Sequence, residues 1–165
     1  MFIAVLLAQF VLPPPLYSHD VLSSSLAPFG DNWFITFVGI FVLNLVLSAF
    51  IVVTLPGMLF FPLSAVFLAY RAVLWGLLLY PLPSWLFLAV LPTLILEGGA
   101  YVFAAVAGTV VGLSWVKPSW MFRGEELSRR EALKTALKEG KTLYKTVVLL
   151  LLVAAIVETA TIMCI

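Results

Sequence analysis

Long apolar runs constrain this chain more than any other feature, because they leave few residues suited to contact with water. Of its 165 residues, 64% are hydrophobic and only 10% are charged. Soluble domains have roughly 45–50% apolar and about 25% charged residues, and a soluble fold of this size has no interior large enough to bury the surplus. We therefore expect most of the chain to lie in lipid, which excludes a cytosolic enzyme and a free nucleic-acid-binding protein.

The apolar runs predict one all-α, polytopic membrane domain over residues 1–165 with four membrane-spanning helices. Their expected ranges are 33–55, 58–80, 85–116 and 144–165. The Pro56-Gly57 pair predicts a tight turn between the first two. The third range is too long for one perpendicular helix and contains Pro92, which predicts a broken or re-entrant segment there. Residues 1–12 are apolar but span only about 18 Å as a helix, so a short N-terminal element packed against the bundle is expected.

The polar segment 117–145 holds eight of the nine basic residues. Short loops rich in Lys and Arg stay in the cytoplasm, so we expect this segment inside and the C-terminus outside. Ser128 and Glu131 have the spacing of a helix capping box. Beyond them, basic residues recur every three or four positions on one face of a helix: Arg130, Lys134, Lys138, Lys141 and Lys145.

This basic face has two interpretations. An apolar face lies beside it, which favours a helix in the membrane surface whose lysines contact anionic lipid headgroups. Alternatively, the segment is an ordinary cytoplasmic loop that is helical. The pattern does not choose between them.

Three charged residues, Arg71, Glu97 and Glu158, fall within the predicted spans. A charge at the centre of a bilayer costs about 2.5–3.5 kcal/mol or more, so it normally faces protein and has a partner. Two hypotheses follow: a polar site inside the bundle, such as a proton or cation relay, or structural pairing of Arg71 with one of the two acids. Pairing with one acid would leave the other unpaired, and that acid would be neutral or hydrated.

Small side chains recur every four residues on the third span, at Ala100, Ala104, Gly108 and Gly112. Such a face lets two helices approach closely in lipid. The partner helix could belong to the same chain or to a second copy.

Catalytic patterns are missing from the sequence. It has no H-E-x-x-H or G-x-S-x-G motif, and its single histidine, His19, lies in a polar stretch with only Asp20 nearby. The single cysteine, Cys164, has no partner for an internal disulfide. We therefore expect no enzymatic activity, no metal and no cofactor.

The run Pro92-x-x-x-x-Glu97-x-x-Ala100, continued by Ala104, Gly108 and Gly112, resembles the stage II sporulation protein M family. Asn44 is similar to an asparagine in the family's early span, which adds it to the intramembrane polar set. Glu158 is similar to a late glutamate. The resemblance covers roughly residues 32 to 162. Thr93 and Leu94 stand where members have His-Gly, so any role of that histidine is lost here.

The resemblance implies a membrane scaffold; the family's named member works with stage II sporulation proteins D and P in peptidoglycan remodelling. We expect a non-catalytic scaffold or assembly factor in envelope or membrane remodelling. Its expected partners are anionic lipids, other membrane proteins and, as a further candidate, a second copy of the chain, but not nucleic acid. The alternative is a small channel or ion-coupled transporter that uses Glu97 and Glu158.

Overall fold

The structure, a computed structural model, describes residues 32–80, 82–116, 119 and 128–164. These residues form helices and no strand, in the order α3 (Trp33–Val42), η1 (Leu43–Thr54), α4 (Leu55–Leu59), α5 (Leu63–Leu79), α6 (Ser84–Val116) and α8 (Arg129–Cys164). The predicted all-α membrane bundle is confirmed. The expected N-terminal apolar element lies outside the described residues.

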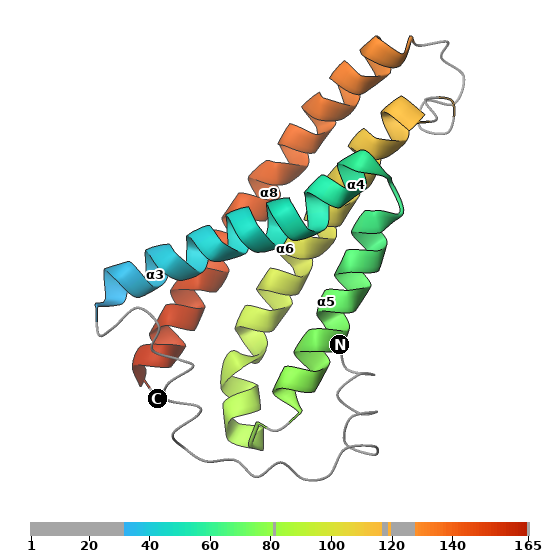
Figure 1. Ribbon diagram of the computed structural model, residues 1–165. Coiled ribbons are helices and arrows are strands. Elements are labelled where there is room, and N and C mark those ends of the chain that lie inside the picture. Colours follow the sequence, from blue (N-terminus) through green and yellow to red (C-terminus); the bar gives the residue numbers. More distant parts are fainter. Residues whose placement is uncertain (1–31, 81, 117–118, 120–127, 165) are drawn as a thin grey trace.

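Three helices are long and apolar enough to cross a membrane: Trp33–Leu59, Ser84–Val116 and Arg129–Cys164. The first of these combines α3, η1 and α4. The shorter α5 is also apolar, and a four-crossing topology stays a prediction. Helix α6 lies between α5 and α8 and contacts both, while the Trp33–Leu59 helix runs obliquely across α8 and α6 (Figure 1).

The predicted turn at Pro56-Gly57 is wrong, because the helix continues to Leu59 and the chain reverses at residues 60–62. Pro56 falls in the first turn of α4, where a missing backbone N–H is tolerated. The preceding η1 is π-helical, with bonds between residues five apart. The Thr54 hydroxyl matches this register, since its Oγ1 donates to the Ala49 carbonyl at 2.9 Å.

Side-chain donors on α5 and α6 stabilise the chain reversal at residues 60–62 by hydrogen bonds to backbone carbonyls. Ser64 Oγ donates to the Val53 carbonyl at 2.9 Å, and Trp115 Nε1 donates to the Met58 carbonyl at 2.8 Å. Thr109 Oγ1 donates to the carbonyl of Phe61 at 3.3 Å. These donors bind carbonyl groups at and beside the reversal and so stabilise the turn where it stands.

The predicted break near Pro92 is also wrong, since α6 is one continuous helix of 33 residues with Pro92 inside it. Proline removes one backbone hydrogen bond. A break would leave several backbone groups unbonded in lipid, which costs more. The pyrrolidine ring of Pro92 lies on the exposed face of α6, whereas Thr93 and Glu97 on the following turn are buried.

The basic residues do not form a separate helix in the membrane surface. They belong to α8, which continues without interruption from Arg129 into the last span. At 1.5 Å per residue, its 36 residues measure about 54 Å, well beyond the roughly 30 Å hydrocarbon core. The basic end of α8 therefore extends past the bilayer as a continuation of the span.

The predicted capping box is confirmed at the start of α8. The backbone N–H and the hydroxyl of Ser128 donate to Glu131 Oε2 at 3.1 and 2.6 Å, and the Glu131 N–H donates back to Ser128 Oγ at 3.4 Å. These hydrogen bonds lower the pKa of the Glu131 carboxyl. The helix start is thus fixed by its own side chains.

The two glycines of the predicted small face pack against the same chain. A Cβ atom added at Gly108 would lie 2.6 Å from the Thr54 carbonyl oxygen, and one at Gly112 would lie 2.0 Å from that of Gly57. Ala100 and Ala104 are fully buried. Within the described residues, the close neighbours of these two glycines therefore lie on η1, α4 and α5 and at Phe61.

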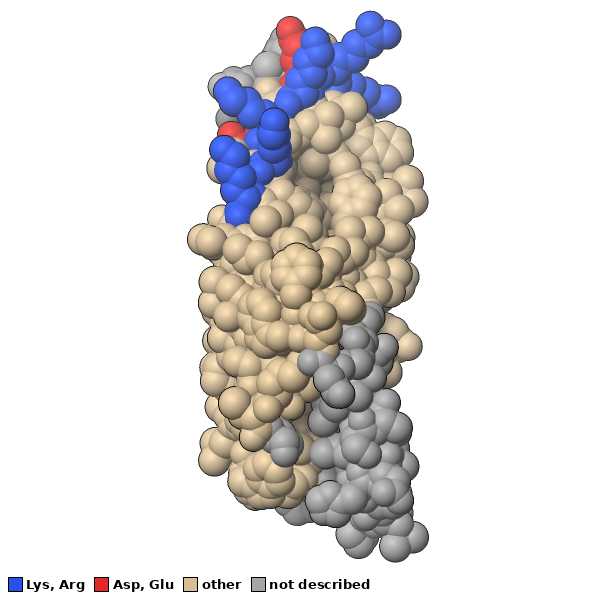
Figure 2. Space-filling model, turned by 90° about the vertical axis from the view of Figure 1, so that its left-hand side faces the viewer, with Lys and Arg blue, Asp and Glu red and all other residues tan. Residues whose placement is uncertain are grey.

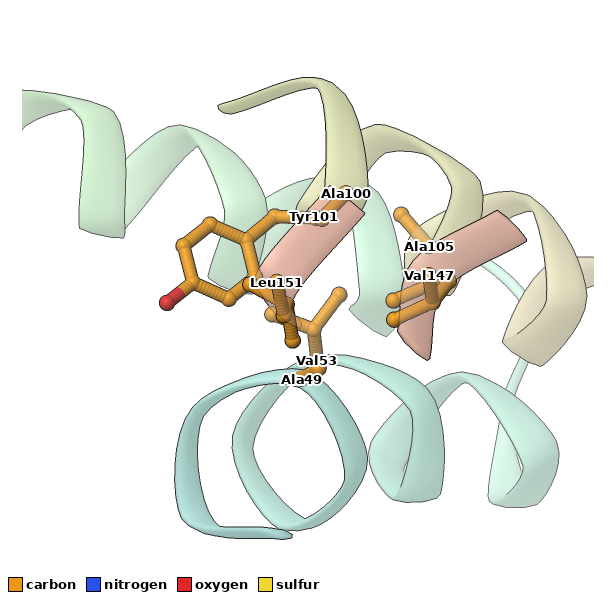
Figure 3. Packing of buried hydrophobic residues seen from close by; sticks show 8 residues of the cluster. Ala49, Val53, Ala100, Tyr101, Ala105, Val147 and Leu151 are labelled. Atoms are coloured by element: carbon orange, nitrogen blue, oxygen red, sulfur yellow. The ribbon is translucent and has the colours of Figure 1, made fainter. Parts of the chain in front are cut away.

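The core joins η1, α6 and α8 through small and medium side chains. Figure 3 shows these side chains converging and labels Ala49, Val53, Ala100, Tyr101, Ala105, Val147 and Leu151. Ala104 belongs to the same cluster. The polar end of α8 continues this packing with buried Ala132, Ala136 and Gly140, and a Cβ at Gly140 would lie 3.5 Å from Val111 Cγ2. In lipid the hydrophobic effect does not drive helices together, so van der Waals contact between closely packed helices stabilises the bundle instead.

We predict that Gly112→Ala destabilises the bundle by about 1–3 kcal/mol, because its Cβ would collide with the backbone of Gly57. Gly98→Ala on the same helix is the control, since a Cβ there meets nothing within 4 Å and should leave stability unchanged or raised by up to about 1 kcal/mol. Denaturation of both variants in detergent, followed by circular dichroism, measures the difference. Equal stability of the two would contradict the packing described.

Candidate functional site

The polar residues predicted within the spans come together with one that was not predicted, Tyr101. We call this group the polar cluster: Asn44, Arg71, Glu97, Tyr101 and Glu158. Glu97 on α6 is only 6% exposed. Its Oε1 accepts a hydrogen bond from the side-chain amide of Asn44 on η1. The Asn44 Oδ1 in turn accepts from the Tyr101 hydroxyl at 3.0 Å, so Asn44 uses both ends of its amide.

Arg71 on α5 reaches the cluster through Tyr101. Its Nη2 donates to the Tyr101 hydroxyl at 3.0 Å. The guanidinium carbon lies 4.4 Å from the centroid of the Tyr101 ring and 5.3 Å from that of Trp75. Stacking on two rings stabilises a cation that has left water, and the positive charge also acts on nearby Glu97.

Glu158 on α8 completes the cluster, because its carboxyl group lies near that of Glu97 and interacts with it. A hydrogen bond between two carboxyl groups requires a proton on one of them. With one shared proton, the two acids carry a single negative charge, which the Arg71 cation balances. A cluster in that state is neutral overall, which lowers the cost of placing it among membrane-spanning helices.

Two polar atoms of the cluster are buried without a hydrogen-bond partner. Glu158 Oε2 is buried and has no hydrogen-bond partner, and the same holds for Arg71 Nε. The cluster is thus nearly but not fully satisfied within the chain.

An apolar groove of about 370 Å³ lies beside the cluster, between α5 and α6. Arg71, Trp75 and Tyr101 line it on one side. Gly98 and Gly99 leave its α6 wall open, and no protein atom lies within 4 Å of a Cβ built at Gly98. The groove reaches Arg71, whereas its lining does not include either acid.

Four segments each contribute to the cluster: η1, α5, α6 and α8. The sequence pattern singled out Asn44, Arg71, Glu97 and Glu158 but missed Tyr101 and Trp75. A usable signal exists, since Tyr101 follows Glu97 by four residues and Trp75 follows Arg71 by four. That spacing places each aromatic ring on the same helix face as the charge.

The basic residues of α8 lie away from the cluster. Arg130, Lys134, Lys138, Lys141 and Lys145 are all exposed. Figure 2 shows Lys and Arg gathered at one end of the molecule, above a surface formed by uncharged residues. Among the described residues, no three His, Cys, Asp or Glu side chains lie together in a way that could hold a metal ion. His19 lies outside that part of the chain, and Cys164 is free and exposed.

The fold and the polar cluster define a polytopic α-helical membrane protein whose intramembrane polar side chains form hydrogen bonds between helices. The family model described as Stage II sporulation protein M matches residues 1–161, so the chain belongs to this family. The match begins about thirty residues before the resemblance seen in the sequence. Neither the curated proteins nor the solved structures contain a match to the chain.

We predict that Tyr101→Phe lowers the free energy of unfolding by about 1–3 kcal/mol, because Arg71 and Asn44 each lose a hydrogen-bond partner in a buried site. Tyr70→Phe is the matched control, since Tyr70 on α5 is 58% exposed. Denaturation in detergent micelles measures both. A loss of the same size in the Tyr70 variant would show that the Tyr101 hydroxyl has no special role.

Proposed function

We propose that the protein is a non-catalytic integral membrane scaffold or assembly factor. One observation carries the proposal: the polar side chains within the spans bond to one another across four segments. Groups used in this way hold helices in register and are not free to act on a substrate. A rigid bundle with an intramolecular polar core is what a scaffold needs to present a fixed surface.

The polar end of α8 supports the same proposal. This helix extends beyond the expected hydrocarbon thickness, and its start is fixed by the Ser128–Glu131 box. Its outer face carries exposed lysines, while Ala132, Ala136 and Gly140 anchor the opposite face in the bundle. We place this end in the cytoplasm, because basic segments are retained there, and the C-terminus outside. It offers a charged, well-anchored surface to partner proteins.

Membership of the stage II sporulation protein M family supports a role in envelope or membrane remodelling. In this proposal the chain brings other proteins together at the membrane and performs no chemistry of its own. Association with a second copy is part of the proposal.

Site-specific photo-crosslinking in native membranes tests the scaffold. A photoreactive residue at Lys134 on the polar end of α8 should capture the same discrete protein in repeated experiments. One at Leu149, which is 60% exposed on the apolar part of the helix, should capture mainly lipid. If the Lys134 position yields only lipid adducts, or a different protein each time, the scaffold proposal fails.

A small channel or ion-coupled transporter is the second candidate, because two carboxyl groups lie side by side within the membrane. Such pairs can take up and release a proton. The groove between α5 and α6 is lined by Arg71 and Tyr101, so it lies directly beside the polar cluster. The acids would then be functional as well as structural.

Proton flux into proteoliposomes, read with an enclosed pH-sensitive dye, separates the two candidates. A transporter predicts that Glu97→Gln lowers flux at least tenfold, whereas Glu139→Gln on the exposed part of α8 leaves it unchanged. Equal flux through the wild type and the Glu97 variant would exclude the transporter and leave the scaffold standing.

A further inference from the structure

We infer that Lys141 and Lys145 of α8, together with the apolar groove below them, form a binding site for one anionic phospholipid. The two lysines lie one helical turn apart on the same face, and both are exposed. A shallow groove of about 430 Å³ is lined by them, by Tyr144 between them, and by Val148, Leu149 and Leu152 below. The site does not depend on the scaffold proposal.

The position of the two lysines along α8 suits a lipid headgroup. The uninterrupted apolar run of this helix begins at Val147, directly after them. Helical side chains tilt toward the N-terminus of their helix, which for α8 is its polar end. The lysine stems therefore point away from the apolar run and carry their ammonium groups toward the headgroup layer.

The groove suits an acyl chain, because the residues that line it below the lysines are all aliphatic: Val148, Leu149 and Leu152. Leu149 and Val148 are 60% and 38% exposed, so the surface faces lipid. Two cations above an apolar channel match the charge pattern of an anionic phospholipid, with a phosphate above and hydrocarbon below.

Tyr144 gives this groove a fixed wall. Its hydroxyl lies 2.5 Å from Thr54 Oγ1 on η1, and its ring packs edge-on against Phe50 at 6.2 Å between centroids. The ring is thereby held from the inside of the bundle while it borders the groove outside. A preformed wall lowers the entropic cost of ordering a lipid chain.

The earlier basic residues provide an internal comparison. Lys134 and Lys138 lie on the same helix and carry the same charge, but they are not among the residues that line the groove. Lys134 lies about 16 Å along the helix axis from Lys145. A diffuse attraction between α8 and an anionic membrane would use all of these lysines, whereas the proposed site uses only the pair above the groove.

Lipid binding to the full-length protein in detergent, followed by native mass spectrometry, tests the site. Phosphatidylglycerol should bind as a single retained adduct, and phosphatidylcholine should bind at least tenfold more weakly. The double variant Lys141→Gln/Lys145→Gln should weaken phosphatidylglycerol binding by about tenfold or more. The variant Lys134→Gln/Lys138→Gln, with the same change in charge, should bind as the wild type does.

A third variant, Val148→Trp, fills the groove without changing charge and should also lower phosphatidylglycerol retention. Circular dichroism establishes that each variant keeps its helix content. Equal losses in the two double variants would overturn the proposal in favour of diffuse electrostatic attraction. Equal binding of the two lipids would overturn it as well, because the lysines would then select nothing.

Discussion

The hydrogen bond from Asn44 to Glu97 is the interaction on which the interior of this bundle depends. It joins η1 to α6, and the remaining polar groups are arranged around its two partners. Tyr101 donates to Asn44 and accepts from Arg71, which brings in α5, while Glu158 meets Glu97 from α8. Without this bond, the Asn44 NH₂ group and Glu97 Oε1 would each lose a partner among apolar helices, where an unmet polar group costs several kcal/mol.

Close packing makes the cluster compatible with the rest of the fold. In lipid, helices gain little from burying apolar surface against each other, so they depend on contact and hydrogen bonding. Gly108 and Gly112 admit η1 and α4 to van der Waals distance of α6. That approach brings Thr54 Oγ1 to 3.0 Å from the Ala104 carbonyl oxygen and keeps Asn44, ten residues earlier, near Glu97.

Hydropathy predicts the helices well because the bilayer imposes their length and composition. The bends are harder to predict from sequence. Pro56 and Pro92 are strong signals for breaks in water, but in lipid the helix persists through both. The chain turns at residues 60–62, where Ser64, Thr109 and Trp115 supply donors from positions that sequence spacing does not connect.

The polar cluster was partly predictable for a related reason. Charges within spans are rare, so Arg71, Glu97 and Glu158 are conspicuous in the sequence. Tyr101 and Trp75 are not, because aromatic residues are common in membrane helices, and only the four-residue spacing to a charge distinguishes them. That Glu97 contacts Asn44 and Glu158, and that Arg71 stacks on aromatic rings, depends on tertiary placement.

The charged residues of this chain thus form two groups: those that the protein itself can neutralise, and those that it leaves uncompensated. Arg71, Glu97 and Glu158 balance one another when one proton is shared, and this requires no outside group. Along α8, from Arg129 to Lys145, six basic residues face only two acids, and nearly all are exposed. Because most polar groups of the buried cluster bond within the chain, the polar end of α8 is the place where exposed, uncompensated charge meets other molecules. A binding partner, whether lipid or protein, gains most where charge is still unpaired, so recognition is expected at the basic end of α8 and not at the buried cluster.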